Sequence, residues 1–444
     1  MPSSHHTPPP YHWFSALAAV LDPRSGPRLA WLLVGAILAR GRRAVTSWIR
    51  AAGLSEEYRP CYTTVAAAGG RADSVAARLV HEVVKPLVAG ADRLTFALDD
   101  TPTERYGRHV QGAGVHHNPT PGPAGSPFVY GHVWVVLGLL ACHPAWGVVA
   151  LPLWARLYVR EKNVPAIPPK DRPPFRTKLE LGVELMRWAK CWLGFLGKPL
   201  WVVADGAYAT ASFLKPMRAL AVTVVSRLRK DAALWTVPGP KPKHRRGPQR
   251  TYGERRIDLA KRGGQRCGWA TGTFTLYGKA TSERYKSFVA TWRPAGGAIR
   301  VVLVDEPKGW VAFFCTDPSA SVADILIAVA NRFSLEVTFH DLKEVVGAGQ
   351  QQVRRVRASV GAFHVCLWTF TLTEAWAWGR DMDGLVGHRS ASPWDDVSRR
   401  PSHADKRRAW RRELLAEEIH AVLRPGLTEQ EMRAAAERLL DLAA

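Results

Sequence analysis

The spacing of hydrophobic residues divides this chain into a helical first part and a later part in which strands and helices alternate. Between Trp13 and Ala89, apolar side chains such as Leu29 and Leu33 recur at helical spacing. From residue 93 the period shortens, and the run RLTFALDDT (residues 93–101) predicts an apolar strand that ends in two carboxylates. The pattern therefore predicts an α/β fold preceded by a helical region.

The apolar runs that follow predict a mixed sheet flanked by helices. Residues 130–141 and 146–159 predict an antiparallel hairpin, and residues 175–194 have an amphipathic helical pattern. A buried strand over residues 199–208, a short helix and another strand complete the series. This order is similar to that of an RNase H-like domain, in which three antiparallel strands precede parallel ones and helices cover both faces.

The composition changes after this core. Residues 230–300 are rich in Pro, Gly, Lys and Arg and later carry alternating aromatics, which predicts a basic β-rich insertion; a charged surface loop is the alternative. A long helix is expected over residues 321–346. The predicted organisation is a disordered tail (1–12), a helical DNA-binding region (13–91), the first part of the core (92–229), the insertion (230–300), the second part of the core (301–380) and a basic helical region (381–444).

The net charge of the chain indicates which kind of molecule it binds. The chain carries 61 Lys and Arg against 38 Asp and Glu, a net charge of +23. Such a balance favours a polyanion, with nucleic acid first and an anionic membrane surface second. The basic residues are spread over several segments without an amphipathic membrane anchor, so we expect double-stranded DNA and no membrane.

The spacing of the cysteines and the composition of the first 15 residues indicate the cellular compartment in which we expect the protein. The six cysteines are scattered without a C-x-x-C pair, which argues against a cysteine zinc site and a disulfide framework. The first 15 residues lack the order of a signal peptide. An apolar stretch over residues 129–154 is interrupted by histidines and prolines, so we interpret it as strands. We expect a cytoplasmic, nucleoid-associated protein.

A basic turn lies within the helical region. The sequence ARGRR (residues 39–43), which includes Arg42 and Arg43, separates two short helical patterns. This is typical of a helix-turn-helix-like DNA-binding module. A plain helical bundle with a basic surface explains the same pattern, and no side chain can be identified as a reader of bases.

Three acidic residues are candidates for chemistry. Asp99 and Asp205 end apolar strands, and ligand sites in α/β sheets lie at the carboxyl ends of strands. Glu336 shares a helical stripe with Arg332 and Lys343, since steps of about 100° per residue place all three within about 40°. Each feature alone has an ordinary explanation, as a turn starter or as a solvated ion pair. Together, three carboxylates can hold two Mg²⁺ ions for phosphodiester chemistry.

These motifs resemble those of bacterial insertion-sequence DDE transposases with an RNase H-like core. The similar pieces are LDDT (98–101), Asp-Gly-x-Tyr (205–208) and R-x3-E-x6-K (332–343), in segment order over about residues 15–380. The family's motif favours Asp99 over its rival Asp100. One departure is Val329, which stands where the family signature has a tyrosine that helps to hold DNA-end phosphates.

The resemblance implies roles for other residues. Asp99, Asp205 and Glu336 would hold two Mg²⁺ ions, for which Mn²⁺ can substitute, and Arg332 and Lys343 would grip phosphates near the cut. An aromatic in the insertion would stabilise a flipped base, and Trp269 and Trp292 are the candidates. We interpret His116 and His117 as residues of a connecting loop, because Mg²⁺ prefers oxygen ligands.

The function expected from sequence is that of a transposase. It would cleave the inverted-repeat ends of its element, join the freed 3′ ends to target DNA and act as a homodimer on DNA. One alternative is a structure-selective nuclease on the same core that never joins ends. The other is a repurposed transposase that only binds DNA.

Overall fold

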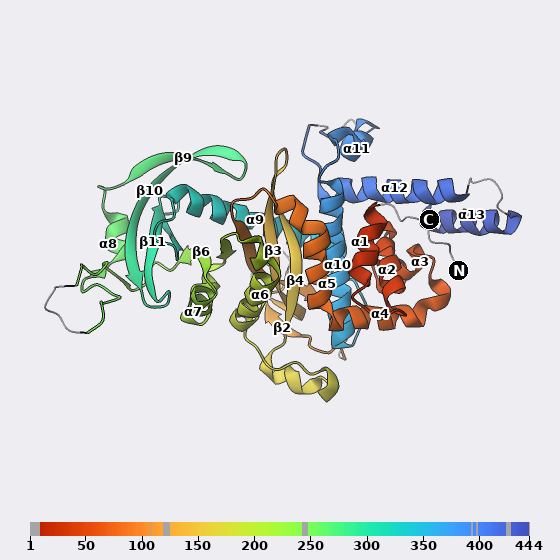
Figure 1. The fold of residues 1–444 in the computed structure, drawn as a ribbon, viewed down its shortest axis with the longest axis horizontal. Coiled ribbons are helices and arrows are strands. Elements are labelled where there is room, and N and C mark those ends of the chain that lie inside the picture. Colours follow the sequence, from red (N-terminus) through yellow and green to blue (C-terminus); the bar gives the residue numbers. More distant parts are fainter. Residues whose placement is uncertain are drawn as a thin grey trace.

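The computed structural model describes residues 9–107, 109–118, 125–241, 247–391, 394–396, 398–422 and 428–443. A mixed sheet runs through the molecule, with the N-terminal and C-terminal helices gathered at one end and antiparallel strands at the other (Figure 1). Mixed α/β architecture with helices on the sheet confirms the fold class at this level, and the strand order is consistent with an RNase H-like core.

The helical region begins earlier than the sequence predicted. Helix α1 starts at Pro9, so residues 9–12 are helical and not part of a disordered tail, while residues 1–8 lie outside the described residues. Proline is accepted in the first turn of a helix because its nitrogen needs no hydrogen bond there. The elements of this region are α1 (Pro9–Ala18), α2 (Gly26–Leu38), α3 (Val45–Ala51), η1 (Ser55–Glu57), α4 (Tyr58–Gly70), α5 (Ala72–Leu79), η2 (Val80–Val84) and η3 (Lys85–Val88).

The central sheet has the predicted series of strands. Its neighbours run in the order β4, β3, β1, β5, β6, with β1, β3 and β4 antiparallel and β5 and β6 parallel to β1. The elements are β1 (Leu94–Glu104), β2 (Gly114–His117), β3 (Phe128–His143), β4 (Gly147–Tyr158), η4 (Glu161–Ala166), η5 (Pro169–Asp171), α6 (Lys178–Leu193), η6 (Gly194–Leu196), β5 (Leu200–Ala204), η7 (Gly206–Tyr208), α7 (Ala211–Ala219) and β6 (Val222–Leu228).

Two histidines expected in a loop lie on a strand. His116 and His117 belong to β2, which pairs antiparallel with the start of β3. Burial is the main cause that lowers the pKa of His116 to about 4, and Arg160 and Lys178 lower it further. His116 is therefore neutral at neutral pH.

The basic segment predicted over residues 230–300 continues the same sheet. Strand β12 pairs antiparallel with β6, and β11, β10 and β7 follow outward from it. The boundary predicted at residue 300 falls inside β11, so the hairpin back to the core is continuous with the segment before it. The elements are β7 (Leu234–Trp235), β8 (Arg256–Ile257), α8 (Leu259–Gly264), β9 (Ala270–Leu276), β10 (Lys279–Trp292), β11 (Gly297–Val304) and β12 (Val311–Cys315).

Opposite faces of the sheet carry different helices. Helix α6 packs on one face, where Gly182 lies against Leu98. Helices α9 (Val322–Glu344) and α10 (Val356–Ala377) cover the other face, where Phe363 stacks on Trp134 at 4.1 Å between ring centroids. Helix α10 is buried along nearly its whole length, because α4 and α12 enclose it on the side away from the sheet.

The C-terminal region packs back on the N-terminal helices. Its elements are α11 (Met382–Val386), η8 (Gly387–Ala391), α12 (His403–Val422) and α13 (Glu429–Ala443). The buried Arg407 of α12 donates to the carbonyl oxygens of Ala36 and Ala39 at the end of α2, where carbonyls lack helical partners. Thr428 and Glu431 form the predicted capping box of α13.

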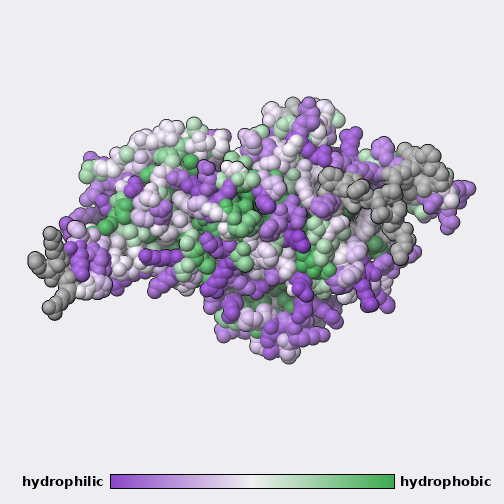
Figure 2. All heavy atoms as spheres, viewed as in Figure 1, coloured by the Kyte–Doolittle hydropathy of each residue, from purple (hydrophilic) through white to green (hydrophobic). Residues whose placement is uncertain are grey.

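Polar residues cover much of the visible surface, with small apolar areas between them (Figure 2). Among the described residues, no helix has the length and hydrophobicity needed to cross a bilayer.

Candidate active site

The register of β1 and β5 places two aspartates side by side. These parallel strands are aligned up to Leu98 opposite Ala204, and the next residue on each is Asp99 or Asp205. Asp205 directly follows the last residue of β5, so this strand ends one position before the predicted end. Asp99 does not end its strand, because β1 stays paired with β3, with Asp99 opposite Val136, and continues to Glu104. The prediction that both carboxylates end strands was therefore wrong for β1.

Helix α9 brings Glu336 and Arg332 to the same place. Arg332 Nη1 donates to Asp99 Oδ2 at 2.6 Å, and its Nη2 donates to Glu336 Oε1 at 2.7 Å. The guanidinium thus joins the carboxylate of β1 to that of α9. The predicted sharing of one helical stripe by Arg332 and Glu336 is confirmed by this contact.

Packing against the sheet fixes the orientation of α9. Ser321 caps its first turn by accepting from the backbone nitrogen of Asp324 at 3.0 Å. Leu335 is buried against Gly138 of β3, and Thr338 Oγ1 donates to the carbonyl oxygen of Ala150 on β4 at 3.0 Å. These contacts turn the polar stripe of the helix toward the edge where Asp99 and Asp205 lie.

The environment of Asp99 differs from that of Asp100. Burial is the largest cause that raises the pKa of Asp99 to about 6; Asp100 and Asp205 also raise it, while Arg332 opposes the shift. Asp100 accepts from Lys178 Nζ of α6 at 2.6 Å, on the opposite face of the strand. Successive residues of a strand face opposite sides, so only Asp99 of this pair faces α9.

The oxygen donors at this place suit a divalent cation in chemistry and charge. Asp99 and Asp205 offer carboxylate oxygens, the ligands that hard cations prefer. Within the described ranges, no three Asp, Glu, His or Cys side chains gather as a ready-made metal site. The carboxylate of Glu336 is paired with Arg332 and linked through it to Asp99. Arg332 therefore supplies one positive charge, which lies between the carboxylates of Asp99 and Glu336.

The other predicted cations lie at the end of α9 and in the turn between α2 and α3. Lys343 is half-buried on the last turn of α9, where burial lowers its pKa and the carboxylates of Glu344 and Glu104 oppose that shift. Arg42 is exposed in the turn between α2 and α3. Arg43 is half-buried, and its backbone nitrogen donates to Gln350 Oε1 at 2.8 Å in the loop after α9. The basic turn thus adjoins the end of the helix that carries Glu336.

The two tryptophans proposed as base contacts differ in exposure. Trp292 is 6% exposed and packs on Phe314, with ring centroids 5.1 Å apart. Trp269 is partly buried, and the charged groups of Arg284 and Lys286 lie over its ring. Because stacking on a base needs an open ring face, we do not carry Trp292 forward as a DNA contact.

An exposed aromatic pair beside α9 was not predicted. Tyr277 at the tip of the β9–β10 hairpin is 66% exposed and touches Phe333 of α9, itself 49% exposed, at 5.9 Å between ring centroids. Tyr277 has a φ of 52° and is followed by Gly278 with a φ of 77°, which matches the two-residue hairpin turn that needs positive φ twice. The Tyr-Gly dipeptide between alternating runs was the available sequence signal.

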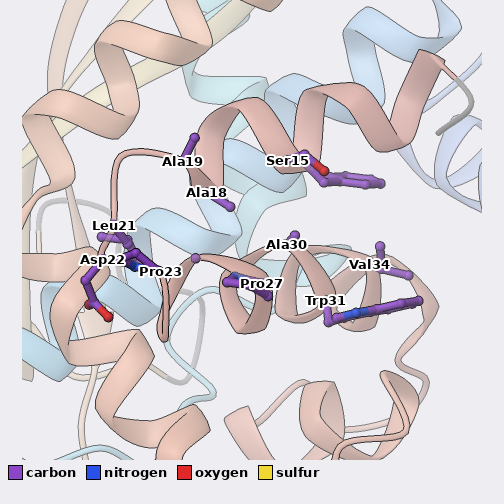
Figure 3. Close-up of a pocket in the computed structure, with 12 residues that line it drawn as sticks. Ser15, Ala18, Ala19, Leu21, Asp22, Pro23, Pro27, Ala30, Trp31 and Val34 are labelled. Carbon is purple, nitrogen blue, oxygen red and sulfur yellow. The ribbon is translucent and has the colours of Figure 1, made fainter. Parts of the chain in front are cut away.

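A separate apolar hollow lies between α1 and α2, away from the carboxylates (Figure 3). Its volume is about 540 Å³, and its lining includes Ala18, Trp31 and Val34, with Asp22 at one end. This lining offers neither a carboxylate cluster nor basic groups suited to phosphates. The hollow therefore does not compete with the β1, β5 and α9 residues as a site for phosphodiester chemistry.

Two family models match the chain. The family model described as DDE superfamily endonuclease matches residues 19–271, which include Asp99 and Asp205. The model described as Transposase DDE domain matches residues 177–372, which include Asp205 and Glu336. A search of curated proteins finds no match. Since the first match covers more than half of the sequence, the chain belongs to the DDE superfamily endonucleases.

Proposed function

We propose that this protein is a transposase that cleaves the inverted-repeat ends of an insertion sequence and joins the freed 3′ ends to target DNA. The observations that support the proposal are the β1–β5 register, which places Asp99 beside Asp205, and the two ion pairs through which Arg332 links Glu336 to Asp99. The transposase and endonuclease matches support nuclease chemistry on DNA.

Asp99, Asp205 and Glu336 would hold two Mg²⁺ ions, with Mn²⁺ as a substitute. The family implies use of a divalent metal. When bound, a metal pair lowers the pKa of an attacking water or 3′-hydroxyl and stabilises the leaving oxygen of an in-line displacement. The chain's own contribution is to fix three carboxylates on rigid strands and one helix at the sheet edge.

Arg332 and Lys343 are proposed to bind phosphates near the cut. Arg332 is 22% exposed and already placed between Asp99 and Glu336, so a phosphate that reaches this edge meets a guanidinium suited to paired hydrogen bonds. Arg42 extends this series of cations toward the N-terminal helices. Tyr277 and Phe333 offer an open aromatic surface next to Arg332 for a base at the DNA end.

Cleavage of a plasmid that carries the flanking ends of the gene tests the proposal. Asp99→Ala, Asp205→Ala and Glu336→Ala should each abolish cleavage in Mg²⁺ while end binding without metal is retained. Asp231→Ala is the matched control, since this exposed carboxylate pairs only with Arg229 in the described structure and should leave cleavage unchanged. A triad variant that keeps full cleavage refutes the assignment of that residue.

The same assay separates the alternatives. Cleavage of branched DNA without preference for the flanking ends, and without joined products, identifies a structure-selective nuclease. Tight end binding without cleavage in Mg²⁺ or Mn²⁺ identifies a repurposed DNA-binding protein. We also propose a homodimer on DNA, because two ends must be held together; light scattering of the protein–DNA complex measures this, and one protomer per pair of ends refutes it.

A further inference from the structure

A buried arginine without a carboxylate partner lies just beyond β1. Arg105 is 5% exposed; its Nε donates to His132 Nδ1 at 3.0 Å, and its Nη1 donates to the carbonyl oxygens of Gly349 and Gln351 at 3.1 and 2.6 Å. Its Nη2 is buried and has no hydrogen-bond partner in the described structure. Carbonyls and an imidazole accept hydrogen bonds but do not neutralise the guanidinium charge.

His132 contributes no compensating charge. Burial lowers its pKa to about 3, with Arg105 as a further cause, so the ring is neutral. Its Nε2 donates to the carbonyl oxygen of Gln111 at 2.9 Å, which leaves Nδ1 as the acceptor from Arg105. A buried charge normally has a counter-ion, because its desolvation is costly. The missing negative charge therefore points to a ligand.

A hollow adjoins this arginine. Its volume is about 180 Å³, and it is lined by Arg105, Tyr106, His109, Arg354 and neighbouring residues, including the Gly349 and Gln351 to which the guanidinium is bonded. Glu104 also lines it, but its carboxylate accepts from the Tyr106 hydroxyl at 2.8 Å and not from Arg105. Arg354 is exposed, so the hollow combines a buried cation with one open to solvent.

The hollow lies on the same side of β1 as the carboxylate of Asp99. Residues 99, 101, 103 and 105 alternate onto one face, and six residues at about 3.3 Å each give a separation of roughly 20 Å. The loop after α9 follows this face, since Gly349 lies against Thr103 and Gln351 accepts from Arg105. At 3.4 Å per base pair, about 20 Å corresponds to roughly six base pairs of DNA.

We propose that the hollow lined by Arg105, His109 and Arg354 binds one backbone phosphate of the DNA whose cleavage site lies at Asp99 and Asp205. This rests on the proposed function and adds a second, distant phosphate contact to it. Arg105 faces the phosphate from the buried side and Arg354 from the open side. The contact fixes the distance between the DNA and the carboxylates, because Arg105 directly follows the strand that carries Asp99.

A scan of neutral phosphates tests the proposal. DNA ends carrying a single methylphosphonate at successive positions are titrated against the full-length protein without metal, and anisotropy gives the affinity. One position within about six base pairs of the cleavage site should weaken wild-type binding about tenfold, as expected for one charged hydrogen-bonded contact. Arg354→Gln should lose affinity for the natural end and become clearly less sensitive to that substitution, because only the Arg105 contact remains.

Arg355→Gln is the matched control. It removes the same charge from the neighbouring exposed residue, which does not line the hollow, and should keep the tenfold sensitivity. Arg105→Lys keeps the positive charge but removes the planar guanidinium, and it should partly reduce the loss of affinity caused by the methylphosphonate. Because Arg105 is buried, a failure of its variant to fold leaves the exposed Arg354 variant to decide.

Three results overturn the proposal. Equal sensitivity of Arg354→Gln and wild type at every position excludes a phosphate contact in this hollow. Calorimetric binding of inorganic phosphate to the free protein that is lost in Arg354→Gln, without any coupled position on DNA, shows a free-anion site instead. The absence of any sensitive position within about six base pairs of the cleavage site also refutes the proposal. The scan measures binding alone, so it stands apart from the cleavage test of the proposed function.

Discussion

Removing the carboxylate of Glu374 should destabilise the protein more than removing an exposed one. Glu374 lies on α10 and is 2% exposed; it accepts from His403 Nδ1 at 2.7 Å and from Lys406 Nζ at 2.5 Å, both on α12. Glu374→Gln keeps the shape but leaves the ammonium of Lys406, itself 3% exposed, without a negative partner. Breaking one side of a buried ion pair typically costs about 3–5 kcal/mol.

The lowered pKa of Glu374 gives a similar value for its contribution to the free energy of unfolding and shows over which pH range this contribution is lost. The pKa of Glu374 is lowered from 4.5 to about 2; burial opposes the shift, but Lys406 and the hydrogen bond from His403 outweigh it. A carboxyl with a depressed folded-state pKa stabilises the fold above pH 4.5, and this contribution disappears as pH falls toward 2. The shift corresponds to about 3 kcal/mol at neutral pH, of which roughly 2 kcal/mol is lost between about pH 5 and pH 3.

Urea unfolding at several pH values measures this effect. The difference in unfolding free energy between wild type and Glu374→Gln should be about 3 kcal/mol at pH 7 and should shrink below pH 4.5. Glu57→Gln is the control, because Glu57 is 53% exposed in its pair with Arg28 and such pairs contribute at most about 1 kcal/mol. A loss below about 1 kcal/mol for Glu374→Gln, or parallel pH profiles for the two proteins, would refute the reasoning.

Three further predictions concern the candidate active site. Tyr277→Ala should weaken binding of DNA ends by about 1–3 kcal/mol in anisotropy titrations, because it removes an aromatic surface, whereas Tyr277→Phe should bind normally; equal losses would show a role for the hydroxyl. Arg332→Gln should increase Mn²⁺ affinity several-fold in paramagnetic titrations of the DNA-free protein, since a competing cation is removed, and Arg332→Lys should not. Gly138→Ala places a methyl 3.1 Å from Leu335 of α9, so cleavage should fall several-fold with little change in end binding; an unaltered rate would show that the helix position is not critical.

Local patterns were sufficient to predict the strands of the central sheet and the pairing of Arg332 with Glu336. The apolar runs around Asp99 and Asp205 are strong strand signals, and parallel strands place their carboxyl ends together whatever the connections between them. The spacing of Arg332 and Glu336 predicts their ion pair, because residues four apart on a helix are neighbours. These inferences depend only on chain periodicity, which the sequence contains directly.

Features that depend on distant partners were not predictable in the same way. The length of β1 beyond Asp99 depends on β3, which continues the pairing after β5 has ended. The burial of Trp292 depends on Phe314, which comes from a later strand. The position of Arg105 beside Gly349 joins residues far apart in sequence. In each case the local residues allow several environments, and the tertiary partner selects one.

Helix α9 connects the proposed chemistry with the proposed phosphate contact. The first turn of α9 is held by the ion pair between Asp324 and Arg93, and its middle by the hydrogen bond from Thr338 to β4. The loop beyond its last turn is held by the hydrogen bond from Arg105. A helix fixed at three points on one sheet cannot shift at Glu336 without disturbing the others, because packed interiors resist small displacements. A phosphate bound at Arg105 would therefore act on the same rigid unit that carries Arg332 and Glu336. This arrangement explains why the distant contact would set the register of DNA at the carboxylates and not merely add affinity.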